Sequence, residues 1–147
     1  MEIETTRFGT IDLTNDIKIF AFSEGLLGFP DQSRYVVLDN PSGGVFQWLQ
    51  STEVPELAFV ICDPLSFMSD YQAPVSRGDL EKVGAKNLED IIVRCIITVP
   101  DNPQDMTANL QGPVIFNFKK MFGRQLVLSD DLGFSTSHYI VPRPQKC

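Results

Sequence analysis

The amino-acid sequence predicts an all-β fold, mainly antiparallel, arranged as a small β-barrel-like domain with one short helix near residues 77–90. Three observations lead to this prediction. Most apolar segments are short and rich in Val, Ile, Phe and Thr, which are the residues that favour strands. Gly, Pro, Asn or Asp residues bound these segments, as they do where tight turns join strands. The segments recur roughly every ten residues, a spacing that favours an antiparallel barrel or sandwich over alternating β–α units.

Turn chemistry divides the chain into nine predicted strands. The motifs GFPD at 28–31, NPSGG at 40–44 and PDNP at 100–103 each lie between two apolar segments. The longest apolar runs are strand-sized, although Arg94 interrupts the second of them. In chain order, the predicted strands span residues 2–8, 17–22, 34–39, 45–50, 57–62, 92–99, 114–118, 123–128 and 137–141.

One segment departs from the strand pattern. Ser76 offers an N-terminal cap and Asp79 follows three residues later, which is the spacing of a capping box. Apolar side chains at Leu80 and Val83 then suit an amphipathic helix that is interrupted near Gly84. This short helix is the only helix of note that the sequence predicts.

The length suits one domain, expected over residues 1–141, followed by a flexible tail at 142–147 that has little apolar character. The three cysteines are Cys62, Cys95 and Cys147. Their spacing matches neither a disulfide framework nor a zinc site, so we interpret the first two as small core residues and expect no metal or cofactor.

Charge is unevenly distributed along the chain. The net charge is −7, and no Lys or Arg occurs between residues 35 and 76. A polyanion is bound mainly through Lys and Arg, so this segment disfavours nucleic acid and suits a basic protein partner. A general solubility charge is the alternative interpretation. The sequence shows no secretory signal pattern and no apolar run long enough for a bilayer, so a cytoplasmic protein without membrane contact is expected.

The motifs of catalysis are not found in the sequence. The single histidine, His138, lies in an apolar and aromatic segment, and no nucleophile elbow, Cys/His signature or phosphate-binding loop accompanies it. Neighbouring carboxylates such as Glu53 and Glu56 lie in polar, turn-like surroundings. We therefore expect a protein that is not an enzyme.

Three blocks of sequence, taken together, resemble one protein family. They are FSEGLLGFP at 22–30, FQWLQS at 46–51 followed by LAFV at 57–60 and by Asp63, and TVP at 98–100 with TANLQGP at 107–113. In this order and spacing, the chain resembles the FliW family of bacterial flagellar assembly factors, over nearly its whole length except the C-terminal tail.

The resemblance implies a function in flagellum biogenesis. A FliW-like protein binds two alternative partners, flagellin and the translational regulator CsrA, which represses flagellin messenger RNA. Flagellin holds the FliW-like protein until flagellin is exported. The released protein then antagonises CsrA and restores flagellin synthesis, and its binding to flagellin also serves a chaperone-like function. The implied fold, a small β-barrel, agrees with the strand pattern.

Candidate contact residues follow from the motifs and from residue chemistry. Trp is enriched among interface anchors and is also highly buried on average, so Trp48 suits either a contact or the core. Alternating polar residues at 107–111 share one face of an extended segment, where they bind either a partner or the adjacent backbone. Gly25, Gly28 and Pro30 are expected to shape a turn. The candidate partner-binding residues are Gln47, Trp48 and Gln50, then Asp63, Phe67, Asp70 and Tyr71, and finally Thr107, Asn109 and Gln111.

Two other classes of function remain open at this stage. A small-molecule-binding or hydrolytic enzyme could use a pocket at the barrel mouth, with His138 and a carboxylate as acid and base. A single-strand nucleic-acid binder could stack bases on the aromatic residues of segment 35–76, but that segment lacks the cations such binding needs.

Overall fold

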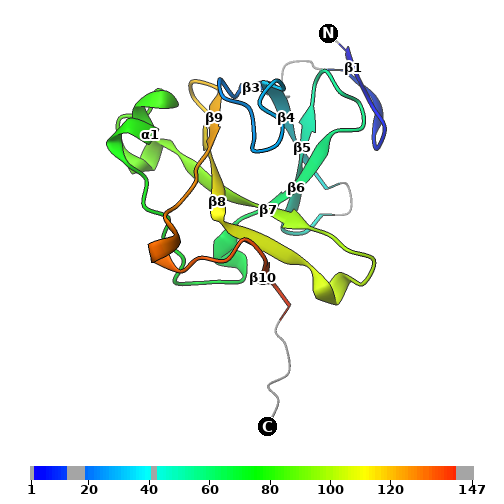
Figure 1. Ribbon diagram of the computed structural model, residues 1–147. Helices are drawn as coiled ribbons and strands as arrows, with labels where there is room; N and C mark the ends of the chain where they lie inside the picture. The colour runs from blue at the N-terminus through cyan, green and yellow to red at the C-terminus, as the bar shows by residue number, and fades with distance from the viewer. Residues whose placement is uncertain (1, 13–18, 41–42, 142–147) are drawn as a thin grey trace.

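The computed structural model describes residues 2–12, 19–40 and 43–141. These residues form ten strands, one α-helix and four short 3-10 helices (Figure 1). The predicted tail at 142–147 and the start of the predicted strand at 17–22 lie outside the described residues. The strands are β1 (Glu2–Thr5), β2 (Gly9–Asp12), β3 (Ile19–Ala21), β4 (Arg34–Asp39), β5 (Phe46–Ser51), β6 (Ala58–Cys62), β7 (Ile92–Thr98), β8 (Thr107–Asn117), β9 (Phe122–Gln125) and β10 (His138–Tyr139). The helices are α1 (Arg77–Lys82), η1 (Pro64–Ser66), η2 (Leu88–Asp90), η3 (Pro103–Asp105) and η4 (Asp130–Leu132).

Seven strands close into a barrel in the order β8-β7-β6-β5-β4-β3-β9, and β9 returns to pair with β8. Neighbouring strands are antiparallel except β3 and β9, which run parallel and meet at Ala21 and Phe122. Strand β10 pairs with the beginning of β8, at Thr107 and Ala108. The predicted all-β, mainly antiparallel barrel is therefore confirmed.

The N-terminal segment forms a hairpin instead of the single strand predicted at 2–8. Gly9 adopts a φ of +70°, and the Thr5 hydroxyl donates a hydrogen bond to the Gly9 carbonyl at 2.8 Å. The same hydroxyl oxygen accepts from the Phe8 amide at 2.8 Å. These contacts reverse the chain, so β1 and β2 pair as a two-stranded sheet of their own.

Strand β8 is longer than the predicted segment at 114–118, because it continues through a bulge. The β7–β8 register shifts between Arg94 and Ile96. On β8, the Asn109 side-chain oxygen accepts hydrogen bonds from the amides of Gln111 and Gly112, at 3.1 and 2.8 Å. This bulge accommodates the Gly-Pro pair at 112–113, which in sequence suggests the end of a strand.

The predicted helix is confirmed in its position and its cap. Ser76 and Asp79 form a capping box at the start of α1. The helix ends at Lys82, with Val83 as its C-cap, and Gly84 follows with a φ of +71°. A second, short 3-10 turn follows as η2. Val83 is fully buried, and its carbonyl accepts a hydrogen bond from the Asn117 side chain at 2.9 Å, which ties the helix to β8.

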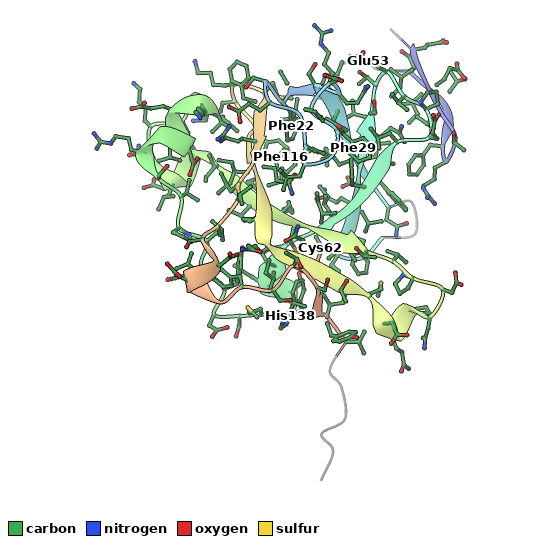
Figure 2. The ribbon with its side chains drawn as sticks, in the orientation of Figure 1. Phe22, Phe29, Glu53, Cys62, Phe116 and His138 are labelled. Atoms are coloured by element: carbon green, nitrogen blue, oxygen red, sulfur yellow. The ribbon has the colours of Figure 1, made fainter. Side chains whose placement is uncertain are left out.

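Aromatic side chains fill the barrel interior. Phe22 and Phe116 lie between the strands in Figure 2, and their rings meet edge to face at 5.8 Å. A second cluster packs β6, β7 and β8 against the segments around Phe67 and Phe134, and it contains the free, buried Cys62 and Cys95. The barrel core consists of Phe20, Phe22, Leu26, Tyr35, Leu49, Ile61, Val114 and Phe116.

Among the described residues, no helix is long and apolar enough to span a membrane.

Candidate partner-binding surface

Trp48 lies on the outer face of the barrel, in the middle of β5. Its neighbour Leu49 is part of the barrel core, and adjacent residues of a strand point to opposite faces. The indole is half-buried, because the guanidinium of Arg7 stacks over it at 4.1 Å and the Phe8 ring meets its edge at 5.8 Å. The ring lines an open hollow of about 610 Å³, which we call the Trp48 hollow and which Phe46, Val60, Val99 and Met106 help to form.

The two glutamines beside Trp48 have different surroundings. Gln50 has no exposed surface, and its amide nitrogen donates to the carbonyls of Ser51, Pro55 and Leu57 at 3.0–3.2 Å. Gln50 therefore shapes the β5–β6 turn and is not accessible to a partner in this structure. Gln47 is half-buried and donates to the Asp39 carboxylate at 2.9 Å.

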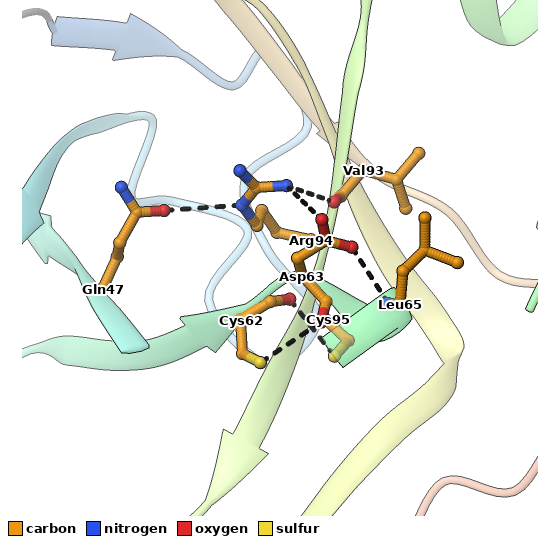
Figure 3. Close-up of polar contacts among 7 residues, drawn as sticks. All are labelled: Gln47, Cys62, Asp63, Leu65, Val93, Arg94 and Cys95. Carbon is orange, nitrogen blue, oxygen red and sulfur yellow. Dashed lines mark hydrogen bonds and ion pairs between the residues drawn. The ribbon is translucent and has the colours of Figure 1, made fainter. Parts of the chain in front are cut away.

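Arg94 joins the Trp48 strand to the acidic loop that begins at Asp63. Its Nε donates to the Gln47 side-chain oxygen at 3.4 Å, and one terminal nitrogen lies 3.9 Å from an Asp63 carboxylate oxygen (Figure 3). The same terminal nitrogen donates to the Val93 carbonyl at 2.9 Å. Two predicted contact regions are thus brought together by a cation that comes from β7.

The acidic and aromatic residues at 63–71 divide between surface and core. Asp63 accepts a hydrogen bond from the Leu65 amide at 2.9 Å and so caps η1. Phe67 stacks on His138 with ring centres 6.0 Å apart, and Asp70 is exposed. Tyr71 is only 6% exposed and donates to the Leu110 carbonyl at 2.7 Å, so it belongs to the core.

An apolar groove runs beside this loop, with a volume of about 630 Å³. Asp63 and Arg94 line it together with Leu65, Leu88 and Ile92. The Leu65 and Leu88 side chains are 54% and 62% exposed, which is unusual for two leucines that share one groove.

The polar residues of β8 share one face, as their alternation predicts. Thr107, Asn109 and Gln111 are half-buried, while Ala108 and Leu110 between them are buried. Asn109 holds the bulge described above. Gln111 donates to the Leu128 carbonyl at 3.2 Å and to the Asp130 carboxylate. The Asn109 and Gln111 side chains are thus engaged with their own chain.

The turn at 22–30 depends on two glycines with positive φ, +64° at Gly25 and +86° at Gly28. A Cβ on Gly25 would lie 2.4 Å from the Phe29 carbonyl oxygen and 2.7 Å from the Pro30 Cα, closer than atoms can approach. This backbone crossing leaves no room for a side chain at Gly25.

His138 packs against an aromatic ring. It is half-buried and stacks on Phe67, with ring centres 6.0 Å apart. In the part of the chain that the structure describes, no group of three or more His, Cys, Asp and Glu side chains is placed to hold a metal ion.

Comparison with known proteins identifies the family. The family model described as FliW protein matches residues 2–140. The chain belongs to the FliW family. It is 39% identical to the flagellar assembly factor FliW of Alkaliphilus metalliredigens over 147 residues, which covers 99% of this chain and 90% of that protein. It is 40% identical to the FliW protein of Bdellovibrio bacteriovorus over 131 residues, 89% of this chain and 74% of that protein.

A solved structure of a FliW protein has the same fold. The crystal structure of the flagellar assembly factor FliW superimposes with a TM-score of 0.89 at 31% sequence identity, covering 97% of this chain and 99% of that one. The sequence blocks that suggested the FliW family form the turn at 22–30, strand β5 and the first part of β8.

Two arginines of the candidate partner-binding surface, Arg7 and Arg94, are not predicted from the sequence. Arg7 covers Trp48, and Arg94 pairs with Asp63. A charged residue in the middle of the apolar run at 92–98 was the only sequence signal for Arg94. For Arg7 there was none, because its position depends on the fold of the N-terminal hairpin.

Proposed function

We propose that this FliW-family protein acts without catalysis as a cytoplasmic partner switch in flagellar assembly. In this proposal it binds and antagonises CsrA, which relieves repression of flagellin messenger RNA, and it alternatively binds flagellin in a chaperone-like manner. The family match over residues 2–140 is the observation that carries the proposal.

The negative charge of this protein supports its proposed role as the partner of an RNA-binding regulator. The net charge is −7, and exposed carboxylates from the cation-free segment lie at Asp39, Glu53, Glu56 and Asp70. A protein that binds RNA must present a basic surface, and an acidic protein docked beside it would complement that surface and repel RNA phosphates.

Release of RNA from CsrA tests the proposal directly. Increasing amounts of this protein are added to CsrA bound to the leader of a flagellin messenger RNA, and free RNA is measured by gel shift. We expect RNA to be released, and we expect added flagellin to reverse the release. RNA that stays bound at every protein concentration would contradict CsrA antagonism.

Charge reversal at Asp70 tests whether the 63–71 loop faces CsrA. Asp70→Lys is preferred to a change at Asp63, because Asp63 also caps η1 and pairs with Arg94. We expect slower association with CsrA at low salt and little change in dissociation, since exposed charges act mainly on encounter.

Asp101→Lys is the matched control, because it makes the same charge change at an exposed aspartate outside the segment 35–76. Equal association rates for the two variants, measured by surface plasmon resonance, would remove the loop from the proposed contact surface.

A further inference from the structure

The Arg7–Trp48 contact joins the N-terminal hairpin to the barrel. The β1–β2 hairpin is a sheet separate from the barrel and lies beside β5 (Figure 1). The Thr6 amide donates to the Pro55 carbonyl at 2.9 Å. Beyond that hydrogen bond, Arg7 and Phe8 rest on the Trp48 ring.

The Trp48 hollow has the chemistry of a site for an arginine side chain. A guanidinium binds the face of an indole through the ring's negative electrostatic potential, and a planar guanidinium stacks better than an ammonium does. Glu56 lines a smaller neighbouring hollow that shares Arg7 and Ala58 with the Trp48 hollow, so a carboxylate lies next to the site on the far side of Arg7. Apolar walls from Phe46, Val60 and the 54% exposed Val99 suit the methylene part of such a side chain.

Arg7 is itself exposed and is held on Trp48 by a contact that is weak at a solvated surface. A second guanidinium could therefore replace it without disturbing the barrel. Two exposed carboxylates adjoin this face, Asp39, which accepts a hydrogen bond from Gln47, and Glu56, which lines the neighbouring hollow, and they favour a partner that is basic.

We propose that the Trp48 hollow receives an arginine side chain of a basic, RNA-binding protein partner, and that this side chain takes the face of the indole that Arg7 covers in the free protein. This inference rests on the proposed function, because that function supplies the partner. Arg7 then lowers the affinity of the hollow for its partner, since a site that is partly occupied by its own chain binds more weakly.

Trp48 is the only tryptophan of the chain, so its fluorescence reports on the hollow alone. The variants Arg7→Ala, Trp48→Leu and Trp48→Phe are titrated with CsrA, and affinity and tryptophan emission are recorded where the indole remains. We expect Arg7→Ala to bind about two- to fivefold more tightly than the parent protein, which is the range of an exposed cation–π contact. Trp48→Leu should bind more weakly, and Trp48→Phe, which keeps an aromatic face, should recover most of the loss.

Arg77→Ala is the matched control, because it removes one positive charge at an exposed arginine of α1, away from Trp48. A gain of affinity that is equal for Arg7→Ala and Arg77→Ala would show a general charge effect and overturn the proposal. Unchanged emission on CsrA binding, with Trp48→Leu binding as the parent does, would overturn it as well while leaving the proposed function intact.

If CsrA does not bind at all, the proposed function fails, and the hollow is tested with short peptides instead. Acetylated Gly-Arg-Gly amide and Gly-Lys-Gly amide are each added to the Arg7→Ala protein. A change of Trp48 emission with the arginine peptide alone supports a guanidinium site, and equal responses to both peptides overturn it.

Discussion

At the residue scale, substitutions at Gly25 and Gly28 distinguish the cost of a strained backbone conformation from the cost of a steric clash, because both glycines lie in the same turn. Both have positive φ, but a Cβ at Gly25 would lie 2.4 Å from the Phe29 carbonyl oxygen, whereas a Cβ at Gly28 would meet nothing within 4 Å. We expect Gly28→Ala to cost about 1–2 kcal/mol for the left-handed backbone alone. Gly25→Ala should cost clearly more, because the two backbone segments must move apart. Urea unfolding of both variants measures the difference, and equal losses would contradict the crossing.

The two buried tyrosines, Tyr71 and Tyr35, should make the protein less stable at alkaline pH. Burial raises the pKa of Tyr71 to about 12, and burial raises the pKa of Tyr35 to about 12 as well. An unfolded tyrosine ionises near pH 10, so the unfolded chain loses these protons first. The contribution of these two tyrosines to the free energy of unfolding should therefore be constant below about pH 10 and fall as the pH rises from 10 to 12.

Tyr71→Phe tests this dependence. At neutral pH the variant loses the hydroxyl's hydrogen bond to the buried Leu110 carbonyl, which should cost about 1–2 kcal/mol. Its stability should then fall less steeply between pH 10 and 12 than that of the parent protein. An identical alkaline slope in urea unfolding would show that Tyr71 is not the titrating group.

At the element scale, α1 is a short helix that begins with a capping box and has a glycine, Gly78, in its first turn. A Cβ added to Gly78 would meet only the Ser76 hydroxyl oxygen, at an ordinary 3.7 Å. Gly78→Ala should therefore stabilise the protein by up to about 1 kcal/mol, the difference in helix propensity. Ser76→Ala should act in the opposite direction by about 1 kcal/mol, because it removes the capping box. Thermal unfolding measures both changes, and a lower melting temperature for Gly78→Ala would contradict the open space at this position.

The elements that could be predicted are those with local signals. Ser76 and Asp79 predict a capping box from their spacing, and the structure contains it. The first half of β8 could not be recognised, because Gly112 and Pro113 suggest a break and only a bulge held by Asn109 lets the strand continue. The turn at Gly9, which makes a hairpin of the predicted strand at 2–8, depends on side-chain bonds of Thr5 that no pattern indicates.

At the scale of the whole molecule, the barrel closes where strands far apart in sequence meet. The β3–β9 contact pairs Ala21 with Phe122. The next residue, Gly123, has no room for a side chain, because a Cβ there would lie 2.3 Å from a ring carbon of Phe22. Such a pairing is set by packing and has no local signal, so the strand order could not be deduced from the sequence.

The candidate surface also depends on the whole fold. The segment 35–76 contains no Lys or Arg in sequence, yet Arg7 and Arg94 from other segments lie against its residues Trp48 and Asp63. The distribution of charge along the sequence therefore does not reveal the two cations that the fold places against this segment. Burial likewise separates Gln50 and Tyr71, which belong to the interior, from Trp48 and Asp70.

We propose that one protein exchanges two partners, CsrA and flagellin. Calorimetric titration of this protein with CsrA from the same organism, at low and moderate salt and with or without saturating flagellin, measures both the binding and the exchange. We expect tight binding that weakens with salt and that flagellin abolishes. Absence of heat and of any complex at both salt concentrations would contradict CsrA binding, and an unchanged titration in the presence of bound flagellin would contradict the exchange.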